Sequence, residues 1–252
     1  MDAATATAEF YQKLVPALNA GLKVSLLLIV PSAVLGFVFG VGLGSARVYA
    51  PQRARRIADG FVSVVRGVPL VIQLFFLYNV MPKLGMFLDS GAEFVTAYLP
   101  EPLQYSGEFF LEALRLDGFG TAVLGFVICS AAYQSEYIRG ALISIRQGQI
   151  KAAQALGFST PQMLLSVVIP QALRRALPGC GNEVIYLIKY SSLAHVVACL
   201  ELTGQADILA GTYYRHVEAF LAAGAYYLAM TSVATFLLHW MERRYAIPGF
   251  QR

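Results

Sequence analysis

The sequence has few charged residues. Asp, Glu, Lys and Arg account for 13% of its 252 residues, while 57% are hydrophobic. A soluble globular chain carries roughly 25% charged residues, so this composition excludes an ordinary water-soluble domain. Three stretches, Val24–Ala46, Gly118–Ser135 and Ala219–Met241, contain none of the four charged types. Each is near the roughly 20 residues that a helix needs to cross the hydrocarbon core of a membrane.

Two further stretches have spanning length although they contain charges, namely Arg66 in the first and Glu183 with Lys189 in the second. The predicted fold class is therefore all-α integral membrane, with five transmembrane helices. These predicted spans cover residues 24–46, 60–82, 118–137, 179–200 and 219–241. Asp2 and Glu9 precede the first span, which is too long for the apolar part of a signal peptide, so we expect it to remain in the mature protein.

The distribution of charges predicts the orientation, because Lys and Arg are enriched on the cytoplasmic side of a membrane. With the N-terminus outside and the C-terminus cytoplasmic, most basic residues fall in cytoplasmic segments. They are Arg47, Arg53, Arg55, Arg56, Arg139, Arg146, Lys151, Arg174, Arg175, Arg243, Arg244 and Arg252. The predicted outer segments instead hold most of the acidic residues. The formal charge of +4 then follows from membrane topology and needs no nucleic-acid partner.

The sequence also lacks the usual motifs for nucleotide binding, nucleophilic catalysis and metal binding. It has no Gly-x-x-x-x-Gly-Lys-Ser/Thr phosphate loop, so we expect ATP to bind elsewhere. Ser191 and Ser192 lie one turn from His195, but three sites on one helix, with no carboxylate expected nearby, do not make a catalytic arrangement. The cysteines have no metal-ligand spacing, and we interpret them as small core residues. They are Cys129, Cys180 and Cys199.

The chain divides into an outer amphipathic segment at 1–20, a transmembrane domain at 21–246 and a cytoplasmic tail at 247–252. The transmembrane domain includes an outer loop at 83–117 and a cytoplasmic loop at 140–178. Gly67 and Pro69 predict a kink in the second span. In the first span, three glycines at four-residue intervals allow another helix to approach closely, either within this subunit or at a subunit interface. They are Gly36, Gly40 and Gly44.

The cytoplasmic loop combines helix-forming sequence with two breaks. Its first half is rich in alanine and is followed by Gly157, which favours a left-handed helix end. Thr160 and Pro161 predict the start of a second helix. We expect Pro170 to bend this helix and Pro178 to end it. The residues alone therefore predict a small helical hairpin between the third and fourth spans.

The same loop carries a resemblance. It reads QGQIKAAQALG over residues 147–157, followed by IPQ at 169–171 and LP at 177–178. This resembles the coupling-loop motif of permeases in ATP-binding-cassette importers. The segments RGVPL at 66–70 and KYSSL at 189–193 are similar to signatures of the polar amino acid subfamily. The resemblance covers about residues 20–250 and implies the type I importer permease fold in a bacterial inner (plasma) membrane. Lys151 replaces the Glu of the coupling-loop motif. In the KYSSL segment, Tyr190 replaces the Asp, Asn or Ser that is usual after the lysine.

The resemblance implies that the loop, over 148–178, contacts a separate ATPase. The implied coupling residues are Gly148, Gln149, Lys151, Ala152, Ala153 and Gly157. We expect docking to rest on Ala152, Ala153 and Gly157, with Lys151 making a different contact or none. The implied partners are a cytoplasmic ATPase dimer that binds ATP and Mg, a second permease, an external solute-binding protein, the lipid bilayer and a polar amino acid. No cofactor and no enzymatic activity are expected in this chain.

The charges within the spans suggest a substrate path or gate. Glu183 and Lys189 each cost roughly 2.5–3.5 kcal/mol near the centre of a membrane helix, and their spacing prevents direct pairing on a straight helix. The full hypothesised set is Arg66, Gln73, Glu183, Tyr186, Lys189, Ser191 and Ser192. For each residue the alternative is a network that fixes helix packing or the gate. Arg66 in particular suits snorkelling or a structural bridge as well as substrate contact.

Two other functions compete with an ATP-driven importer. A secondary transporter or channel driven by an ion gradient is disfavoured, because five spans without symmetry between halves do not match the usual internal repeats. An intramembrane enzyme would need convergent catalytic groups, which the sequence lacks. The identity of the solute, and whether the second permease is identical or paralogous, stay open.

Overall fold

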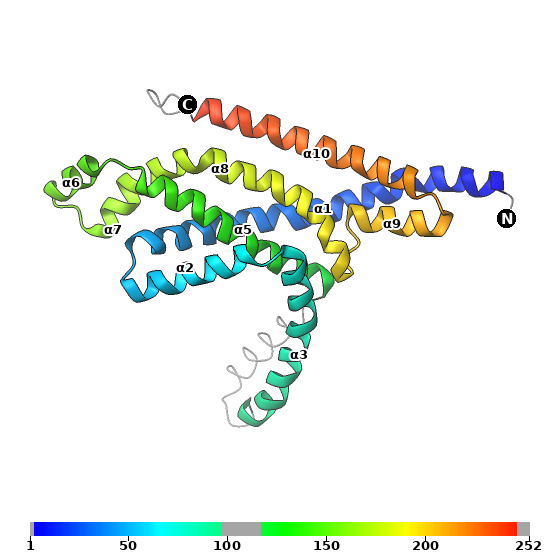
Figure 1. Cartoon of the computed structure of the whole chain (residues 1–252), viewed down its shortest axis with the longest axis horizontal. Helices are drawn as coiled ribbons and strands as arrows, with labels where there is room; N and C mark the ends of the chain where they lie inside the picture. The colour runs from blue at the N-terminus through cyan, green and yellow to red at the C-terminus, as the bar shows by residue number, and fades with distance from the viewer. Residues whose placement is uncertain (1–2, 97–116, 246–252) are drawn as a thin grey trace. The chain divides into compact units, whose positions relative to one another are not determined.

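The computed structural model describes residues 3–96 and 117–245, and all regular structure within these ranges is helical (Figure 1). The helices are α1 (Ala3–Tyr49), α2 (Gln52–Gly67), α3 (Leu70–Thr96), α5 (Gly118–Ile143), α6 (Gln147–Ala155), α7 (Thr160–Met163), η1 (Leu164–Val168), α8 (Ile169–Tyr190), η2 (Ser191–Val197), α9 (Leu202–Tyr213) and α10 (His216–Arg244). The η1 segment is a π-helix and η2 is a 3₁₀-helix.

Three helices are each long and apolar enough to cross a membrane, namely α1 over Thr5–Tyr49, α5 and α10. The number rises to five when two bent helix pairs each count as one span. These pairs are α2 with Leu70–Lys83, and Thr160–Val197 with α9. The second and fourth predicted spans are therefore broken, whereas the other three are continuous helices. The side of the membrane on which each terminus lies stays a prediction.

The second predicted span is interrupted where its sequence predicts a kink. Helix α2 ends at Gly67, and α3 begins at Leu70 after Pro69. The side-chain amide of Gln73 donates a hydrogen bond to the carbonyl of Val68 at 2.8 Å, which satisfies a backbone group that the break leaves exposed. Helix α3 then passes through Pro82, the predicted end of the span, and continues to Thr96. The rest of the predicted outer loop, residues 97–116, and the tail at 247–252 lie outside the described residues.

The fourth predicted span differs from the structure at both ends. Pro178 lies inside α8 and does not end the helix as predicted, because one missing backbone hydrogen bond is not enough to interrupt 22 residues of helix. The regular α-helix stops at Tyr190, in the middle of the predicted span, and continues as η2. Ala198, just beyond η2, has a positive φ of 60° that breaks the chain direction before α9.

The chain forms two compact units. The first contains Met1–Leu28, Val68–Gly125 and Ser191–Phe220, and the second contains Ile29–Gly67, Phe126–Tyr190 and Leu221–Arg252.

In the first unit, the predicted outer segment is not a separate helix but the beginning of α1. Phe10 is fully buried and packs edge-on against Tyr213, with 5.8 Å between ring centroids. Arg215 donates a hydrogen bond to the hydroxyl of Thr7 at 2.7 Å. Phe10, one of the apolar positions that predicted an amphipathic helix on the outer surface, therefore contacts the end of α9.

The same unit buries an acidic residue that the charge distribution placed in an outer segment. The Glu201 carboxylate accepts a hydrogen bond from the backbone of Gly204 at 3.0 Å and caps the start of α9. The backbone amide of Leu202 donates to the hydroxyl of Ser25 at 3.2 Å. These contacts connect α1 to α9 through polar groups that are fully buried.

In the second unit, the three glycines of the first span contact α5 of the same chain. A Cβ at Gly36 would lie 2.6 Å from the Ser130 hydroxyl, and one at Gly40 would lie 2.8 Å from the Cβ of Gln134. At Gly44 the distance to the Ser135 carbonyl would be 3.0 Å. Only glycine permits this approach. These glycines therefore allow helix packing within the subunit, which was one of the two alternatives predicted for them.

Candidate functional site

The predicted cytoplasmic hairpin consists of α6, α7 and η1, at one end of α5 and α8 (Figure 1). Gly157, with φ of +80°, follows α6 in the predicted left-handed conformation. The amide of Gly157 bonds to the carbonyl of Gln154 at 2.9 Å, and that of Phe158 to Ala153 at 3.1 Å. This pair of bonds is a Schellman motif, which terminates the helix sharply.

The second helix of the hairpin begins one residue earlier than predicted. Ser159, not Thr160, is the N-cap, and the side chain of Gln162 accepts hydrogen bonds from the backbone and hydroxyl of Ser159 at 3.0 and 2.9 Å. Pro161 lies in the first turn, as expected. The side chain of Arg175 on α8 then donates to the carbonyl of Ser144 at 2.7 Å, which closes the base of the hairpin.

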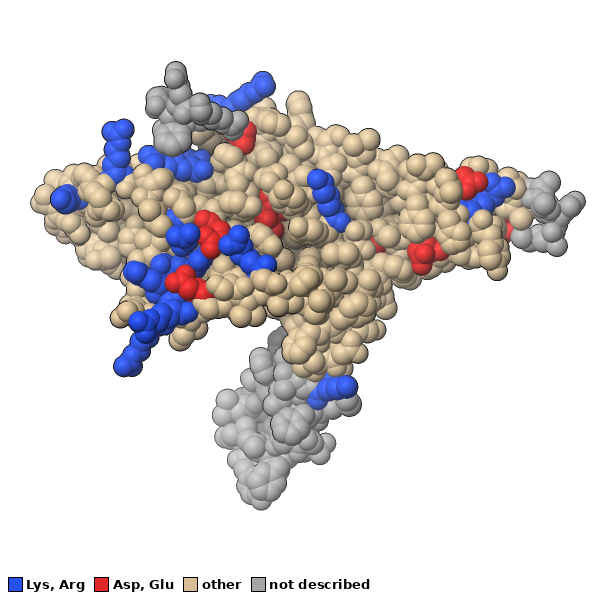
Figure 2. Space-filling view, viewed as in Figure 1, with Lys and Arg blue, Asp and Glu red and all other residues tan. Residues whose placement is uncertain are grey.

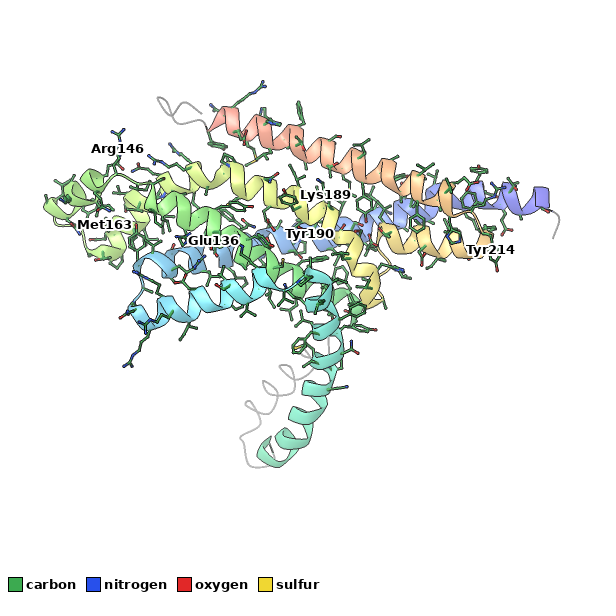
Figure 3. All side chains as sticks on the ribbon, viewed as in Figure 1. Glu136, Arg146, Met163, Lys189, Tyr190 and Tyr214 are labelled. Carbon is green, nitrogen blue, oxygen red and sulfur yellow. The ribbon has the colours of Figure 1, made fainter. Side chains whose placement is uncertain are left out.

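The predicted coupling residues do not share one face of α6. Gly148, Gln149, Lys151, Ala152 and Gly157 are exposed. Ala153 is only 4% exposed and packs into the core of the second unit, where Met163 (Figure 3) also lies. The expectation that Ala153 belongs to the docking surface is therefore wrong in its geometry, because this side chain stabilises the hairpin from inside.

Two apolar residues that the sequence reasoning missed lie beside the exposed coupling residues. Leu156 is 77% exposed and Phe158 is 39% exposed. They flank Gly157, so the end of α6 presents large apolar side chains as well as small ones. The sequence signal for them is their position beside the C-terminal glycine of a predicted helix, where apolar side chains are common.

Arg66, a predicted path residue, belongs to a group of charges that we call the Glu136 cluster. Its members are Arg47 of α1, Asp59 and Arg66 of α2, and Glu136 and Arg139 of α5. One carboxylate, Glu136, is 2.8 Å from Arg47, 3.1 Å from Arg66 and 3.0 Å from Arg139 (Figure 3). Arg47 also pairs with Asp59 at 2.7 Å, and its side chain is only 7% exposed.

These contacts support the structural alternative for Arg66. Its guanidinium also lies 5.1 Å from the centre of the Tyr133 ring, a cation–π distance. The guanidinium of Arg66 thus has both a carboxylate and an aromatic ring as partners within the protein. Gln73, another predicted path residue, is likewise engaged at the helix break in the first unit.

The remaining charged path residues lie on different faces of α8. Glu183 is buried, and its Oε1 has no hydrogen-bond partner among the described residues. Asn182, Tyr186 and Lys189 are exposed along a neighbouring face of the helix, and we call them the α8 polar stripe. The ammonium of Lys189 (Figure 3) lies 5.7 Å from the centre of the Tyr186 ring. As predicted from their spacing, Glu183 and Lys189 do not share a face.

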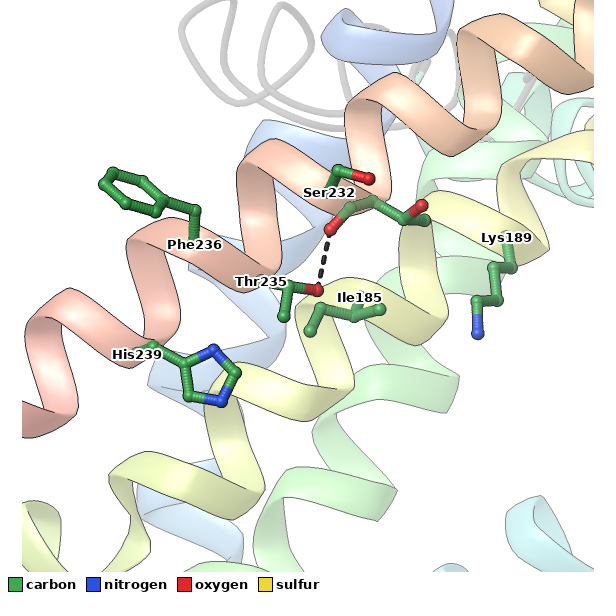
Figure 4. Close-up of a pocket in the computed structure, with 7 residues that line it drawn as sticks. Ile185, Lys189, Ser232, Thr235, Phe236 and His239 are labelled. Atoms are coloured by element: carbon green, nitrogen blue, oxygen red, sulfur yellow. Dashed lines mark hydrogen bonds between the residues drawn. The ribbon is translucent and has the colours of Figure 1, made fainter.

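Lys189 also borders an open groove between α8 and α10 (Figure 4). The groove has a volume of about 500 Å³, within the range of about 300–1,000 Å³ usual for small-ligand sites. Its lining residues are Ile185, Lys189, Thr231, Ser232, Thr235, Phe236 and His239. The hydroxyl of Thr235 donates to the carbonyl of Thr231 at 2.7 Å, so its oxygen remains able to accept a hydrogen bond. The groove thus combines one cation, several hydroxyls and apolar walls.

Residues 22–247 match the family model described as the inner membrane component of binding-protein-dependent transport systems. The chain belongs to this family. It is a translocation subunit of an ATP-binding-cassette importer, and the alternative of a secondary transporter is excluded.

Relatives and solved structures agree with this membership. The permease is 36% identical over 234 residues to the glutamine transport system permease protein GlnP of Escherichia coli (strain K12), covering 92% of this chain and 94% of that protein. It is 34% identical to the octopine transport system permease protein OccM of Rhizobium radiobacter, across 90% and 88% of the two chains. A crystal structure of an amino acid ABC transporter with histidines has a TM-score of 0.74 and 29% identity, covering 93% of this chain and 96% of that chain.

An inward-facing methionine ABC transporter, MetNI, has a TM-score of 0.72 at 18% identity, covering 93% of the permease and 99% of that chain, and shows the shared fold alone. The expected type I importer permease fold is therefore confirmed. Family membership also implies an ATPase and a binding protein as partners of the permease.

Ser191 and Ser192, the last predicted path residues, lie in η2 of the first unit, where Ser191 is buried. The sequence reasoning was wrong that no carboxylate lies near His195, because Asp207 approaches its Nε2 at 3.2 Å. The other ring nitrogen, Nδ1, has no hydrogen-bond partner among the described residues. The absence of nucleophilic catalysis in this chain stays a prediction.

Proposed function

We propose that this permease carries a polar amino acid across the bacterial inner membrane and that the α8 polar stripe lines its path. The observation that carries the proposal is the exposure of Asn182, Tyr186 and Lys189 on a helix that belongs to the fourth candidate span. A lysine ammonium facing lipid costs roughly 2.5–3.5 kcal/mol near the helix centre. The stripe is therefore suited to a water-filled path shared with a second permease, identical or paralogous.

The chemistry of the groove fits the proposed substrate class. An amino acid has a carboxylate that a lysine ammonium can bind. It also has an ammonium group that can donate hydrogen bonds to hydroxyl oxygens. The Lys189 ammonium lies on one side of the groove, and the Thr231 and Thr235 hydroxyls lie on α10. Relatives named for glutamine, octopine and cystine transport support this class without selecting one solute.

The hairpin would transmit the ATPase cycle to this path. A cytoplasmic ATPase dimer, which binds ATP and Mg, contacts the exposed end of α6, including Ala152, Leu156 and Gly157. Exposed apolar side chains at a rigid helix end are typical of a protein interface. The Lys151 side chain is exposed beside them and lacks the negative charge of the family motif, so any ionic contact there requires an acidic partner.

Reconstitution of the permease with its candidate ATPase, second permease and external binding protein tests the proposal. We expect uptake to depend on ATP and on the binding protein, and a panel of labelled amino acids identifies the solute. Lys189→Met should abolish most uptake of the preferred solute, while the matched control Lys23→Met, an exposed lysine of α1 in the first unit, should not. Unchanged rate and selectivity in Lys189→Met and Glu183→Gln would remove α8 from the path.

A further inference from the structure

Helix α2 has one side for which the described fold supplies no partner. The opposite side is buried in the second unit through Ala58, Val62 and Val65. The unpartnered side consists of Arg53, Ile57, Gly60, Phe61 and Val64, which we call the α2 stripe. All five residues are exposed, and at about 100° per residue they fall within an arc of about 100° on the helix surface. The stripe is therefore one continuous surface.

The arginines at the basic end of this stripe differ from the other arginines nearby in their lack of polar contacts within the described residues. Figure 2 shows Lys and Arg side chains gathered around α2, with acidic side chains among them. Arg55 is turned back to the end of α1, where it donates to the carbonyl of Val48 at 2.8 Å. Arg53 and its neighbour Arg56 are exposed, and neither has an ion pair or hydrogen bond within residues 3–96 and 117–245. Two guanidinium groups at the start of α2 thus have no ionic partner in the part of the chain that the structure describes.

The remainder of the stripe is apolar. Ile57 is 75% exposed, Phe61 42% and Val64 66%. Gly60 lies between them, and nothing is within 4 Å of where its Cβ would be, so the stripe is locally hollowed. A glycine inside a helix costs roughly 1 kcal/mol relative to alanine, and no close packing within the described residues explains this one.

The length of the stripe matches one leaflet of a membrane. Arg53 and Val64 are separated by about 16 Å along the helix at 1.5 Å per residue, close to half of the roughly 30 Å hydrocarbon core. A guanidinium group at the headgroup level would therefore leave Val64 near the bilayer centre. An acidic protein surface would match the arginines but not the apolar remainder.

We infer that the α2 stripe is a binding site for an anionic phospholipid. The phosphate lies between Arg53 and Arg56, where guanidinium groups offer paired donors to its oxygens. One acyl chain follows Ile57 and Phe61 and fills the hollow at Gly60. Anionic headgroups are favoured over zwitterionic ones because each arginine near the membrane surface adds a favourable electrostatic contribution. The inference does not depend on which solute the permease carries.

The test measures lipid binding to the purified transporter, with permease and ATPase partner assembled in mild detergent. Native mass spectrometry follows titration with phosphatidylglycerol and, separately, with phosphatidylcholine of the same acyl chains. In the double variant Arg53→Gln/Arg56→Gln, we expect the affinity for phosphatidylglycerol to fall about thirtyfold, from the loss of two arginine contacts. The affinity for phosphatidylcholine should change less than threefold or so.

Two further variants separate a site from general charge and from misfolding. Arg174→Gln removes an exposed arginine of α8 in the same unit and should leave phosphatidylglycerol binding unchanged. Gly60→Leu keeps both arginines, fills the hollow with a better helix former and should weaken phosphatidylglycerol binding several-fold in a fully folded transporter.

Three results would overturn the inference. An equal loss of affinity in Arg174→Gln would show general electrostatic attraction in place of a site. Equal competition by glycerophosphoglycerol, the headgroup without acyl chains, would show a site for soluble anions. Release of the ATPase or of the second permease from the double variant, with phosphatidylglycerol affinity unchanged, would assign the stripe to a protein interface.

Discussion

Arg66 and Lys189 are both charged residues in predicted membrane spans, and both belonged to one hypothesised path, but the second unit surrounds them differently. Arg66 lies within the Glu136 cluster, where it contacts a shared carboxylate and the Tyr133 ring. Lys189 lies on the α8 polar stripe beside an open groove. The contrast separates two uses of an intramembrane charge. Arg66 joins helices through ion pairs, whereas Lys189, under our proposal, binds a solute.

The sharpest way to break this comparison is to remove the shared carboxylate. Glu136→Gln removes the carboxylate that Arg47, whose side chain is 7% exposed, shares with Arg66 and Arg139, and should lower the free energy of unfolding by about 3 kcal/mol. Denaturant unfolding of the purified permease in detergent measures the loss. Asp59→Asn is the control, because Asp59 is 45% exposed and its removal should cost about 1 kcal/mol or less. Equal losses in the two variants would show that Glu136 has no central role.

The joining function also predicts a difference between two glycines of α1. Gly40→Val places methyl groups against Gln134 of α5 and should destabilise the permease by about 1–3 kcal/mol through overpacking. Gly42→Val on the same helix has nothing within 4 Å of its Cβ and should be nearly neutral. Thermal unfolding midpoints compare the two. A destabilising Gly42→Val would mean that valine is disfavoured at both positions for reasons other than contact with α5.

A paired substitution tests the comparison directly. Lys189→Gln should reduce the rate of solute uptake about tenfold, equivalent to about 1.4 kcal/mol, without a measurable change in stability. Arg66→Gln should lower the free energy of unfolding by about 1 kcal/mol, because the Arg66 side chain is 41% exposed. Uptake per folded transporter should then be close to normal. The reverse pattern, with stability lost in Lys189→Gln and uptake lost in Arg66→Gln, would invert the two assignments.

The smallest expected effect of a substitution on stability is in the hairpin, which has no buried charge. Gly157→Ala forces a side chain into the left-handed conformation at φ of +80° and should cost about 1 kcal/mol. The position is otherwise open, so the loss comes from the backbone alone. Gly148→Ala, at an open position without positive φ, is the control and should not destabilise. The ratio of solute transported to ATP hydrolysed in each variant reports whether the end of α6 must be rigid for coupling.

Much of the fold was predictable because it depends on local sequence. The three charge-free stretches identify the continuous spans, Pro69 identifies the break between α2 and α3, and Gly157 identifies the end of α6. Pro178 was misleading, because proline weakens a helix locally while the packing of the rest of α8 maintains it. The outer segment was misjudged for a similar reason. Its apolar spacing predicts a helix with one buried side, but not what that side contacts.

The candidate site was predictable only in part. Periodicity places Glu183 and Lys189 on different faces, but it cannot tell which face is buried. The Glu136 cluster could not be predicted from the sequence, because its ion pairs join three helices. Arg47 and Glu136, for example, are 89 residues apart along the chain. Likewise, Ala153 has the same small side chain as Ala152, and only the packing of α6 on η1 and α7 distinguishes the buried alanine from the exposed one.

The π-helix η1 sets the rotational phase between the hairpin and the membrane. A π-turn contains one more residue than an α-turn needs, and that residue rotates everything after it by about 100° relative to everything before it. The number of residues in η1, which lies outside the groove, therefore determines which face of α8 lines the groove. Deleting one residue from Leu164–Val168 would return the segment to α-helical phase. It would then turn either the hairpin or the α8 polar stripe away from its present direction, with no change in any side chain of either surface.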